Sequence, residues 1–187
     1  MLQLVLEGVL AMDLEKMGRA VGLFLESVGE NLKREGIDGT PKRVVKYFST
    51  FTPQNPLVDA EYPKKFVKLF LEASLVGKEQ LVEVSSIPFF TFCEHHLLPF
   101  FGTVDISYIP SEGKILGLSK FGRIVEYFSK KFQNQERITD QIASFVFDNV
   151  PSKGVRVVAR AQHMCMIARG IKALGSETRT EVVKGVI

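Results

Sequence analysis

Two short windows of the sequence hold every cysteine and every histidine. One is Cys93-Glu94-His95-His96 and the other is His163-Met164-Cys165. Thiolates and imidazoles are the ligands that Zn²⁺ prefers in proteins. Two inert core thiols are the plainer alternative, but burial of cysteine gives no reason for the histidines to cluster beside it. The windows therefore predict a metal site.

The spacing within the windows indicates which side chains share the metal. Cys93 and His96 are three residues apart, so a helical or turn-like loop places both on one side and directs His95 elsewhere. His163 and Cys165 are two apart on an expected strand and share a face. Ligation by Cys93, His96 and Cys165 leaves the fourth tetrahedral position to water, which is an open, catalytic arrangement. A closed structural site, with His95 or His163 as fourth ligand, is the alternative.

The remaining histidines and the nearby basic residues suggest the chemistry. An imidazole with a pKa near neutrality, placed beside a metal-activated water, suits hydrolysis. Basic side chains stand near an expected helix start and after the second window: Lys120, Arg123, Arg169 and Lys172. Helix N-termini attract anions, so we expect a phosphate-bearing ligand, although each charge alone is more simply a solvated surface residue. The sequence has no GxxxxGK[ST] loop, so this ligand is not held as in P-loop enzymes.

The elements that position these windows begin with a helical part. Apolar residues recur at three-four spacing over 14–32 and predict an amphipathic helix that Gly36 ends. Thr40, followed by proline, is expected to cap a second helix. Residues 51–63 contain three prolines and predict a loop, and 64–74 suggests a third helix.

After Gly77 the pattern changes to strands. Residues 81–92 are rich in Val, Ile and Phe, and 102–108 alternate apolar with polar side chains. The sequence Ser-Glu-Gly-Lys at 111–114 predicts a turn, so that 115–118 pairs back as a hairpin.

Two helices and a last strand complete the pattern. Ser119 is expected to cap a helix that contains Ile124, Ile138 belongs to another helix, and a final strand runs over 155–166. The polar run 133–137 between the helices is expected to be a solvated loop. Strands that bracket a helix pair, after a helical first third, indicate an α+β fold with an antiparallel sheet.

The composition bounds the class of protein. The chain has 187 residues, of which 45% are hydrophobic, so it folds around an apolar core and is not disordered. We expect a single domain over 1–187, with a mainly helical part over 1–76 and a catalytic sheet-and-helix part over 77–187. The 24 Lys and Arg exceed the 21 Asp and Glu by too few to imply nucleic acid.

The sequence suggests neither export nor a membrane. No apolar run approaches the roughly 18 residues of a spanning helix. The apolar first dozen residues contain Glu7 and lack a basic start and a cleavage site, which argues against a signal peptide. Two cysteines are too few for a disulfide framework and fit a reducing compartment. We therefore expect a cytoplasmic protein without a membrane partner.

Five segments together resemble the motifs of the GTP cyclohydrolase I family in order and spacing. They are TPKR at 40–43, CEHHLLPFFG at 93–102, GLSKFGRIVEYF at 117–128, QNQERIT at 133–139 and HMCMIARG at 163–170. The resemblance extends over about residues 38–172, and the joint occurrence is far more specific than any single motif.

The resemblance implies a fold and a reaction. The fold is the tunnelling fold, an antiparallel sheet with helices on one side, which closes into rings and forms a homodecamer of two stacked pentamers. The reaction converts GTP and water to 7,8-dihydroneopterin triphosphate and formate, the first step of pterin and folate-type cofactor biosynthesis.

The resemblance also implies roles for individual residues. Zn²⁺ would be held by Cys93, His96 and Cys165, the set that the spacing proposed independently. His95 and His163 would move protons, and Ser119 would lie near the ribose. Further residues would bind the substrate: Glu136 and neighbouring Gln135 at the guanine edge in a buried site, Lys120, Arg123 and Arg169 at the triphosphate, and Arg43 and Lys46 from a neighbouring subunit.

Two other functions fit parts of this pattern. A nitrile reductase of the same fold superfamily would use a cysteine nucleophile and a nicotinamide cofactor, but it does not need both metal windows. A zinc-stabilised module that binds nucleic acid would have four protein ligands and would not turn over GTP. Bound zinc separates the first from a cyclohydrolase, and turnover of GTP separates the second.

Overall fold

The computed structural model describes residues 12–51 and 62–187, and contacts within the chain group it into two compact units, Met1–Asp59 and Ala60–Ile187. Each unit is considered by itself. The expectation that one domain spans both stays a prediction, and most of the expected loop over 51–63 lies outside the described residues. Within the described residues, no helix is long and apolar enough to span a bilayer.

The first unit contains two helices, α1 (Leu14–Ser27) and α2 (Thr40–Phe51), which confirms both predicted helices. Helix α1 ends earlier than its apolar spacing predicts, because Gly29 takes a left-handed conformation and its N–H donates to Glu26 O. Leu32 then folds back against Gly22 of the helix. The apolar spacing therefore continues past Ser27 although the helix does not.

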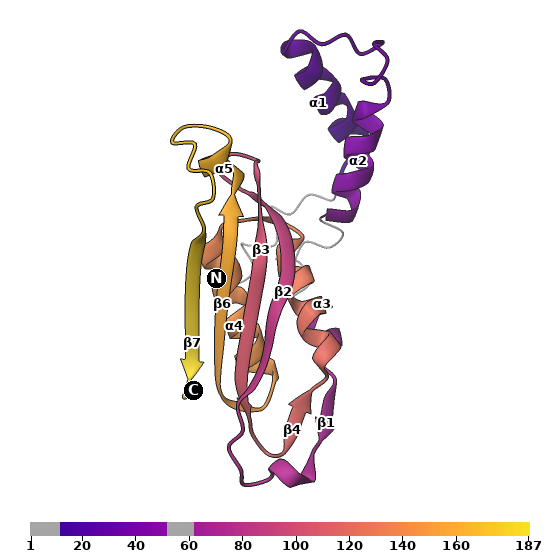
Figure 1. The fold of residues 1–187 in the computed structure, drawn as a ribbon. Coiled ribbons are helices and arrows are strands. Elements are labelled where there is room, and N and C mark those ends of the chain that lie inside the picture. Colours follow the sequence, from indigo (N-terminus) through magenta and orange to yellow (C-terminus); the bar gives the residue numbers. More distant parts are fainter. Residues whose placement is uncertain (1–11, 52–61) are drawn as a thin grey trace, which may run out of the picture. The chain divides into compact units, whose positions relative to one another are not determined.

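The second unit is built on a five-stranded sheet with the order β5-β2-β3-β6-β7 (Figure 1). Neighbouring strands are antiparallel except β2 and β5, which pair in parallel over two residues. The strand bounds are β2 Val82–Cys93, β3 Pro99–Pro110, β5 Phe132–Gln133, β6 Ser152–His163 and β7 Thr178–Gly185. The predicted strands at 81–92 and 102–108 are confirmed, and the second is longer than expected.

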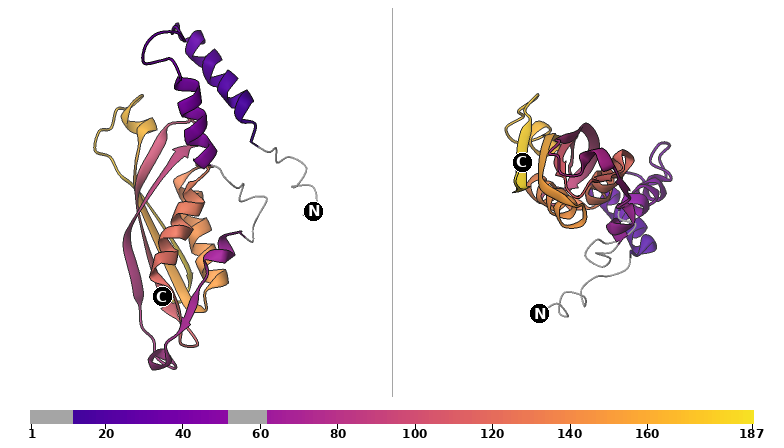
Figure 2. Two further views of the ribbon diagram at one scale, coloured as in Figure 1. Left: turned by 90° about the vertical axis from the view of Figure 1, so that its right-hand side faces the viewer. Right: turned by 90° about the horizontal axis from the view of Figure 1, so that it is seen from below.

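Two helices, α3 (Leu118–Ser129) and α4 (Gln135–Asn149), cover one face of this sheet (Figure 2). Alternation along β3 points Val104, Ile106 and Tyr108 toward the helices, where each is at most 1% exposed. Ile124 of α3 and Ile138 of α4 pack in the same core and are fully buried. Full burial of each such side chain contributes about 1.5–3 kcal/mol. The predicted α+β fold, with helices on one side of an antiparallel sheet, is confirmed.

The predicted third helix over 64–74 is wrong. The segment forms a 3-10 turn (Tyr62–Phe66), strand β1 (Leu69–Leu71) and a second 3-10 turn (Ala73–Leu75). Strand β1 pairs with β4 (Lys114–Leu116), so β4 does not form the expected hairpin with 102–108. The turn itself is present, since Lys114 N–H donates to Ser111 O over 3.0 Å. Pairing between distant segments overrides the local helical spacing here.

The C-terminal part differs from its prediction in two ways. Strand β6 stops at His163, and a helical turn, α5 (Met164–Ile167), follows it. A further strand, β7, pairs with β6 and was not predicted, because its sequence TRTEVVKG lacks a regular apolar alternation.

Two predicted helix caps are also wrong. Gly117 occupies the N-cap of α3, so Ser119 lies within the first turn. The Thr40 hydroxyl accepts from Arg43 Nη2 over 2.7 Å and donates to Gly36 O, so it does not cap α2. In both cases the residue is near the helix start, but its hydroxyl does not accept from the helix backbone.

Candidate metal centre

The first window forms the tight connection between β2 and β3. Cys93 ends β2, its C=O accepts from Leu97 N–H over 2.9 Å, and its N–H donates to Leu98 O over 2.8 Å. Leu97 takes a left-handed conformation that closes the turn. The turn-like loop is the one that the spacing predicted, and it places Cys93 Sγ 3.9 Å from His96 Nδ1. His95 Nδ1 lies 3.7 Å from the same sulfur, so the expectation that the turn directs His95 elsewhere is wrong.

Cys165 reaches the same place from the other window. It lies in α5, immediately after β6, so the prediction that it shares a strand face with His163 is wrong. Ligand atoms of Cys93, His96 and Cys165 nevertheless all lie within 4.8 Å of one another. Tetrahedral Zn²⁺, with bonds of about 2.0–2.3 Å, needs ligand atoms about 3.5–4 Å apart. The three side chains fit a metal ion after small rotations.

The electrostatics of the two thiols also favour a cation. Burial, together with the neighbouring Cys93 thiol, raises the pKa of Cys165 above its ordinary value. Cys93 is 5% exposed and Cys165 is half-buried, so water has limited access to the two sulfurs. A dication between them would stabilise both thiolates.

The other two histidines stand outside this group among the described residues. His95 is exposed, with Nδ1 3.7 Å from Cys93 Sγ and Nε2 3.8 Å from Glu94 Oε1. His163 is half-buried, and its ring stacks on Phe100 with centroids 4.5 Å apart and planes 5° apart. Burial lowers the pKa of His163, and the nearby Glu136 charge offsets this in part. Among the described residues, the arrangement is thus a group of three candidate ligands with two further imidazoles nearby. The choice between an open and a closed site stays a prediction.

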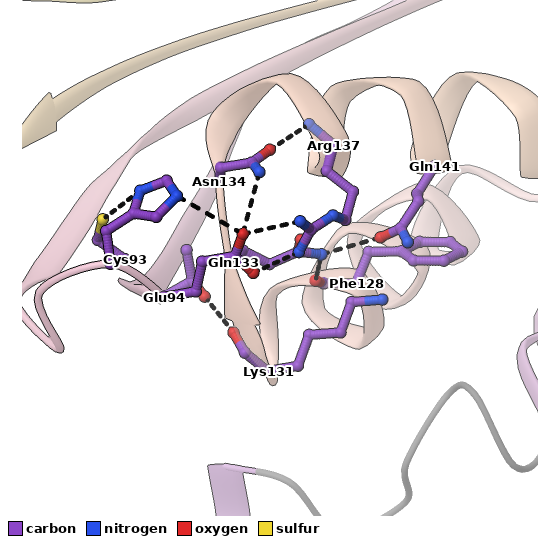
Figure 3. A network of polar contacts seen from close by, with 10 residues as sticks. Cys93, Glu94, Phe128, Lys131, Gln133, Asn134, Arg137 and Gln141 are labelled. Carbon is purple, nitrogen blue, oxygen red and sulfur yellow. Dashed lines mark hydrogen bonds and ion pairs between the residues drawn. The ribbon is translucent and has the colours of Figure 1, made fainter. Parts of the chain in front are cut away.

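A polar network joins the metal-binding turn to the start of α4 (Figure 3). The Glu94 carboxylate accepts from both terminal nitrogens of Arg137, at 2.5 and 2.7 Å, and from Asn134 Nδ2 at 3.3 Å. Asn134 Oδ1 in turn caps α4 by accepting from Arg137 N–H over 2.8 Å. The hydrogen bond from Arg137 is the main reason that the pKa of Glu94 lies below its ordinary value. Sequence reasoning missed Glu94 and Arg137, although Glu94 stands between two candidate ligands.

The polar run 133–137 is not the solvated loop that was expected. Gln133 forms β5 with Cys93 as its partner, and Gln135 begins α4. Both glutamines are at most 1% exposed. Glu136 in the first turn of α4 is exposed in the single chain, contrary to the buried carboxylate that was expected.

The candidate phosphate-binding residues are divided between two ends of the sheet. Arg169 follows α5 and lies near enough to affect the Cys165 thiol electrostatically. Ser119, Lys120 and Arg123 lie instead at the start of α3, where Leu116 N–H donates to the Tyr108 hydroxyl.

The length of β3 gives the separation between these two ends. Pro99 pairs with Phe92 beside the metal-binding turn, and Tyr108 lies nine residues farther along the strand. At about 3.3 Å per residue this is a distance of about 30 Å. One chain therefore does not bring Lys120 and Arg123 to its own Cys93-His96-Cys165 group.

Arg43 and Lys46 belong to the first unit. The Arg43 guanidinium donates to Gly36 O, Asp38 O and Thr40 Oγ1 over 2.9, 3.1 and 2.7 Å, and so holds the segment that precedes α2. Lys46 is exposed and borders a groove of about 460 Å³ between α1 and α2.

Comparison with known proteins assigns the sequence to a family. The profile described as GTP cyclohydrolase I matches residues 17–187. The chain belongs to the GTP cyclohydrolase I family. It is an enzyme of that type, and the nitrile reductase alternative is set aside because the match covers both metal windows.

Curated relatives carry the same name. GTP cyclohydrolase 1 of Streptococcus agalactiae serotype V is 46% identical over 174 residues, which are 92% of this chain and 88% of the relative. GTP cyclohydrolase 1 of Pelotomaculum thermopropionicum is 43% identical over 174 residues, which are 93% and 89% of the two chains. A solved structure of the archaeosine synthase QueF-Like in the apo form covers 57% of this chain and 95% of its own, at 18% identity and a TM-score of 0.45.

Proposed function

We propose that the chain is a zinc-dependent GTP cyclohydrolase I, which converts GTP and water to 7,8-dihydroneopterin triphosphate and formate in the first step of pterin and folate-type cofactor synthesis. The observation that carries the proposal is the convergence of Cys93, His96 and Cys165 within 4.8 Å in a chain of this family. Zn²⁺ bound there would lower the pKa of a water molecule and so supply a nucleophile for C8 of guanine.

The neighbouring histidines would move the protons of this reaction. Attack at C8 leaves negative charge on the imidazole part of guanine, and a proton delivered to N7 neutralises it. His163 is suited to this step because it lies two residues before the candidate ligand Cys165, and its imidazolium form can deliver a proton. His95, which is exposed next to Cys93, would serve the later steps in which the ring opens and formate leaves.

Guanine would be selected at the start of α4. The Glu136 carboxylate can accept hydrogen bonds from both guanine N1–H and the 2-amino group, whereas adenine offers an acceptor at N1. Its exposure in the single chain leaves it available to a ligand.

The triphosphate would be held by residues of more than one subunit. Arg169 stands at the metal end, whereas Ser119, Lys120 and Arg123 lie about 30 Å away along β3. If all of them serve one site, a second copy of the chain has to supply the α3 residues. We also expect Arg43 and Lys46 to approach the site from a neighbouring subunit. These contacts would bind and orient GTP, since the triphosphate is retained in the product.

The sheet offers edges through which copies could associate. Among the described strands, β7 has β6 as its one partner, and β2 pairs only with β3 from Val82 to Thr91. Open edges of this kind pair readily with another chain, and pairing around a ring leaves none exposed. This supports the proposed homodecamer of two stacked pentameric rings. A metal site with two reduced thiols supports a cytoplasmic location, with GTP rather than nucleic acid as partner.

The function is tested by incubating zinc-loaded protein with GTP and measuring formate and the fluorescence of the oxidised pterin. Both products should form in equal amounts, and protein treated with a chelator or supplied with ATP should form neither. Protein that holds one zinc per chain but releases no formate from GTP would contradict the proposal. That result would favour the zinc-stabilised binding module.

A further inference from the structure

The Gln135 side chain is buried in a fixed orientation under the candidate site. It is 1% exposed, and its Nε2 donates to Ala159 O over 3.1 Å and to Thr178 O over 2.8 Å. Both partners are backbone carbonyls, which can only accept. An amide rotated by 180° would set its own oxygen against two carbonyl oxygens, so the position of the NH₂ group is determined by the fold.

The opposite end of the amide therefore presents an acceptor to His163. Gln135 Oε1 lies 2.7 Å from His163 Nε2. Because an amide oxygen cannot donate, the hydrogen between these atoms belongs to Nε2. The neutral imidazole then carries its lone pair on Nδ1.

A second contact fixes the plane of the same ring. Phe100 is the cross-strand partner of His163, is fully buried, and stacks on the imidazole with planes 5° apart. Stacking restricts tilt of the ring, and the hydrogen bond to Gln135 restricts its rotation. Together they aim Nδ1 in one direction.

We propose that Gln135 is a positioning residue, which fixes the orientation and tautomer of His163 so that Nδ1 is the atom that exchanges a proton with the substrate. This rests on the proposed function of the site. The imidazolium form carries protons on both nitrogens, transfers the Nδ1 proton to guanine N7, and becomes the neutral ring with its proton on Nε2. Gln135 accepts from Nε2–H before and after this transfer, so the ring does not have to turn.

This role differs from the expected contact between Gln135 and guanine. Both amide protons of the side chain are already used by backbone carbonyls. No side-chain donor is left for the base, and recognition of the guanine edge falls to Glu136.

The direct test uses the unaltered, zinc-loaded protein. Histidine labelled with ¹⁵N allows magnetic resonance to identify which ring nitrogen carries the proton, and the loss of one signal in His163→Ala assigns the spectrum. The neutral form of His163 should carry its proton on Nε2. A proton on Nδ1 would overturn the proposal. This readout does not need turnover, so a protein inactive with GTP would count against the proposed function and not against this role of Gln135.

A kinetic test compares two variants in the same helix. Gln135→Leu removes the acceptor for His163, whereas Thr139→Val removes buried hydrogen bonds to Gln135 O and Thr180 Oγ1 without touching the histidine. Gln135→Leu should keep its zinc and its KM for GTP within about threefold, but lower kcat about 10- to 100-fold. Thr139→Val should retain kcat. Equal kcat in the two folded variants would contradict the positioning role, and a raised KM with unchanged kcat would return Gln135 to guanine binding.

Discussion

Glu94 and Arg137 form a two-point ion pair that joins the metal-binding turn to the first turn of α4. The carboxylate stands between the candidate ligands Cys93 and His96, and the guanidinium follows directly after Glu136. The pair therefore connects the group that would hold zinc with the residue that would read guanine. Its side chains are 29% and 43% exposed, so the pair adds at most about 1 kcal/mol to stability. Its larger effect should be to hold the metal-binding turn in position against α4.

We expect Glu94→Gln to change the free energy of unfolding by less than about 1 kcal/mol. The same change should weaken zinc binding about 10-fold, because the turn is no longer held against α4. Zinc affinity is measured by competition with a chromogenic chelator. Glu126→Gln, which breaks a surface pair with Lys130, is the matched control and should leave the affinity unchanged. An equal effect of both variants would show that the Glu94 pair does not position the turn.

The zinc content of two variants, measured by elemental analysis, should distinguish a metal ligand from the histidine that transfers protons. Cys165→Ser should lose zinc and activity together, because only two strong ligands remain. His163→Ala should keep one zinc per chain and lose turnover, because His163 lies outside the three-ligand group. If His163→Ala is also free of metal, His163 is a ligand and the site is closed.

Glu136→Gln should weaken binding of GTP about 10- to 100-fold while zinc content stays at the parental level. The amide replaces a charged acceptor and places a donor opposite guanine N1–H. Asp140→Asn, one turn farther along α4 and paired with Lys184, is the control and should bind GTP normally. Binding of GTP is measured by calorimetry with all variants in the His163→Ala background, which should not turn over GTP during the measurement. Parental affinity in the Glu136 variant would move guanine recognition elsewhere.

Two inactive variants should restore activity when they assemble together. Within one chain, the Cys93-His96-Cys165 group and the first turn of α3 lie about 30 Å apart, so one active site needs both from different subunits. In a mixed oligomer, some subunit interfaces join the intact Cys165 of a Lys120→Ala subunit to the intact Lys120 of a Cys165→Ser subunit. Activity of the coexpressed pair, purified through two different tags, should rise well above that of either parent. Inactive mixed oligomers would mean that each chain completes its own site.

The stability cost of Lys131 should depend on pH. Burial, with a smaller effect of the Arg137 charge, lowers the pKa of Lys131 to about 8, although Nζ lies 5.3 Å from the centre of the Phe128 ring. The unfolded chain keeps this proton up to about pH 10.4. Below pH 8 both states are charged and the full cost is present, and between pH 8 and 10 stability rises because the unfolded state binds more protons.

Lys131→Met removes this cost, so its gain in unfolding free energy over the parent at pH 7 should shrink as the pH rises from 8 to 10. Urea denaturation at fixed protein concentration measures it. Lys130→Met is the control, since it removes a neighbouring charge that pairs with Glu126. A Lys131→Met effect that stays constant with pH would show that Lys131 is solvated in the folded protein.

Much of the fold followed from local patterns. Alternation along 102–108 and the apolar spacing around Ile124 and Ile138 predicted β3, α3 and α4, because one buried face per element leaves a clear period. The prediction of a helix over 64–74 was wrong because the apolar residues of this segment fit a helix as well as a strand. Pairing of β1 with β4 decided between them, and this depends on a segment more than 40 residues away. Strand β7 was not predicted because its sequence has little apolar pattern of its own, and it forms through its pairing with β6.

The sequence by itself determined the family and the group of candidate metal ligands. Both depend on features that do not require knowledge of how the elements pack, namely soft ligands confined to two short windows and motifs in a fixed order. Only the tertiary structure decided that Gln135 lies buried against His163, that Glu136 is exposed, and that Lys120 is remote from Cys93 in the same chain. Spacing along the chain sets the direction of side chains within one element. Burial and contact between elements depend on strand register and on which helix covers which strand, and these are set by the packing of the whole core.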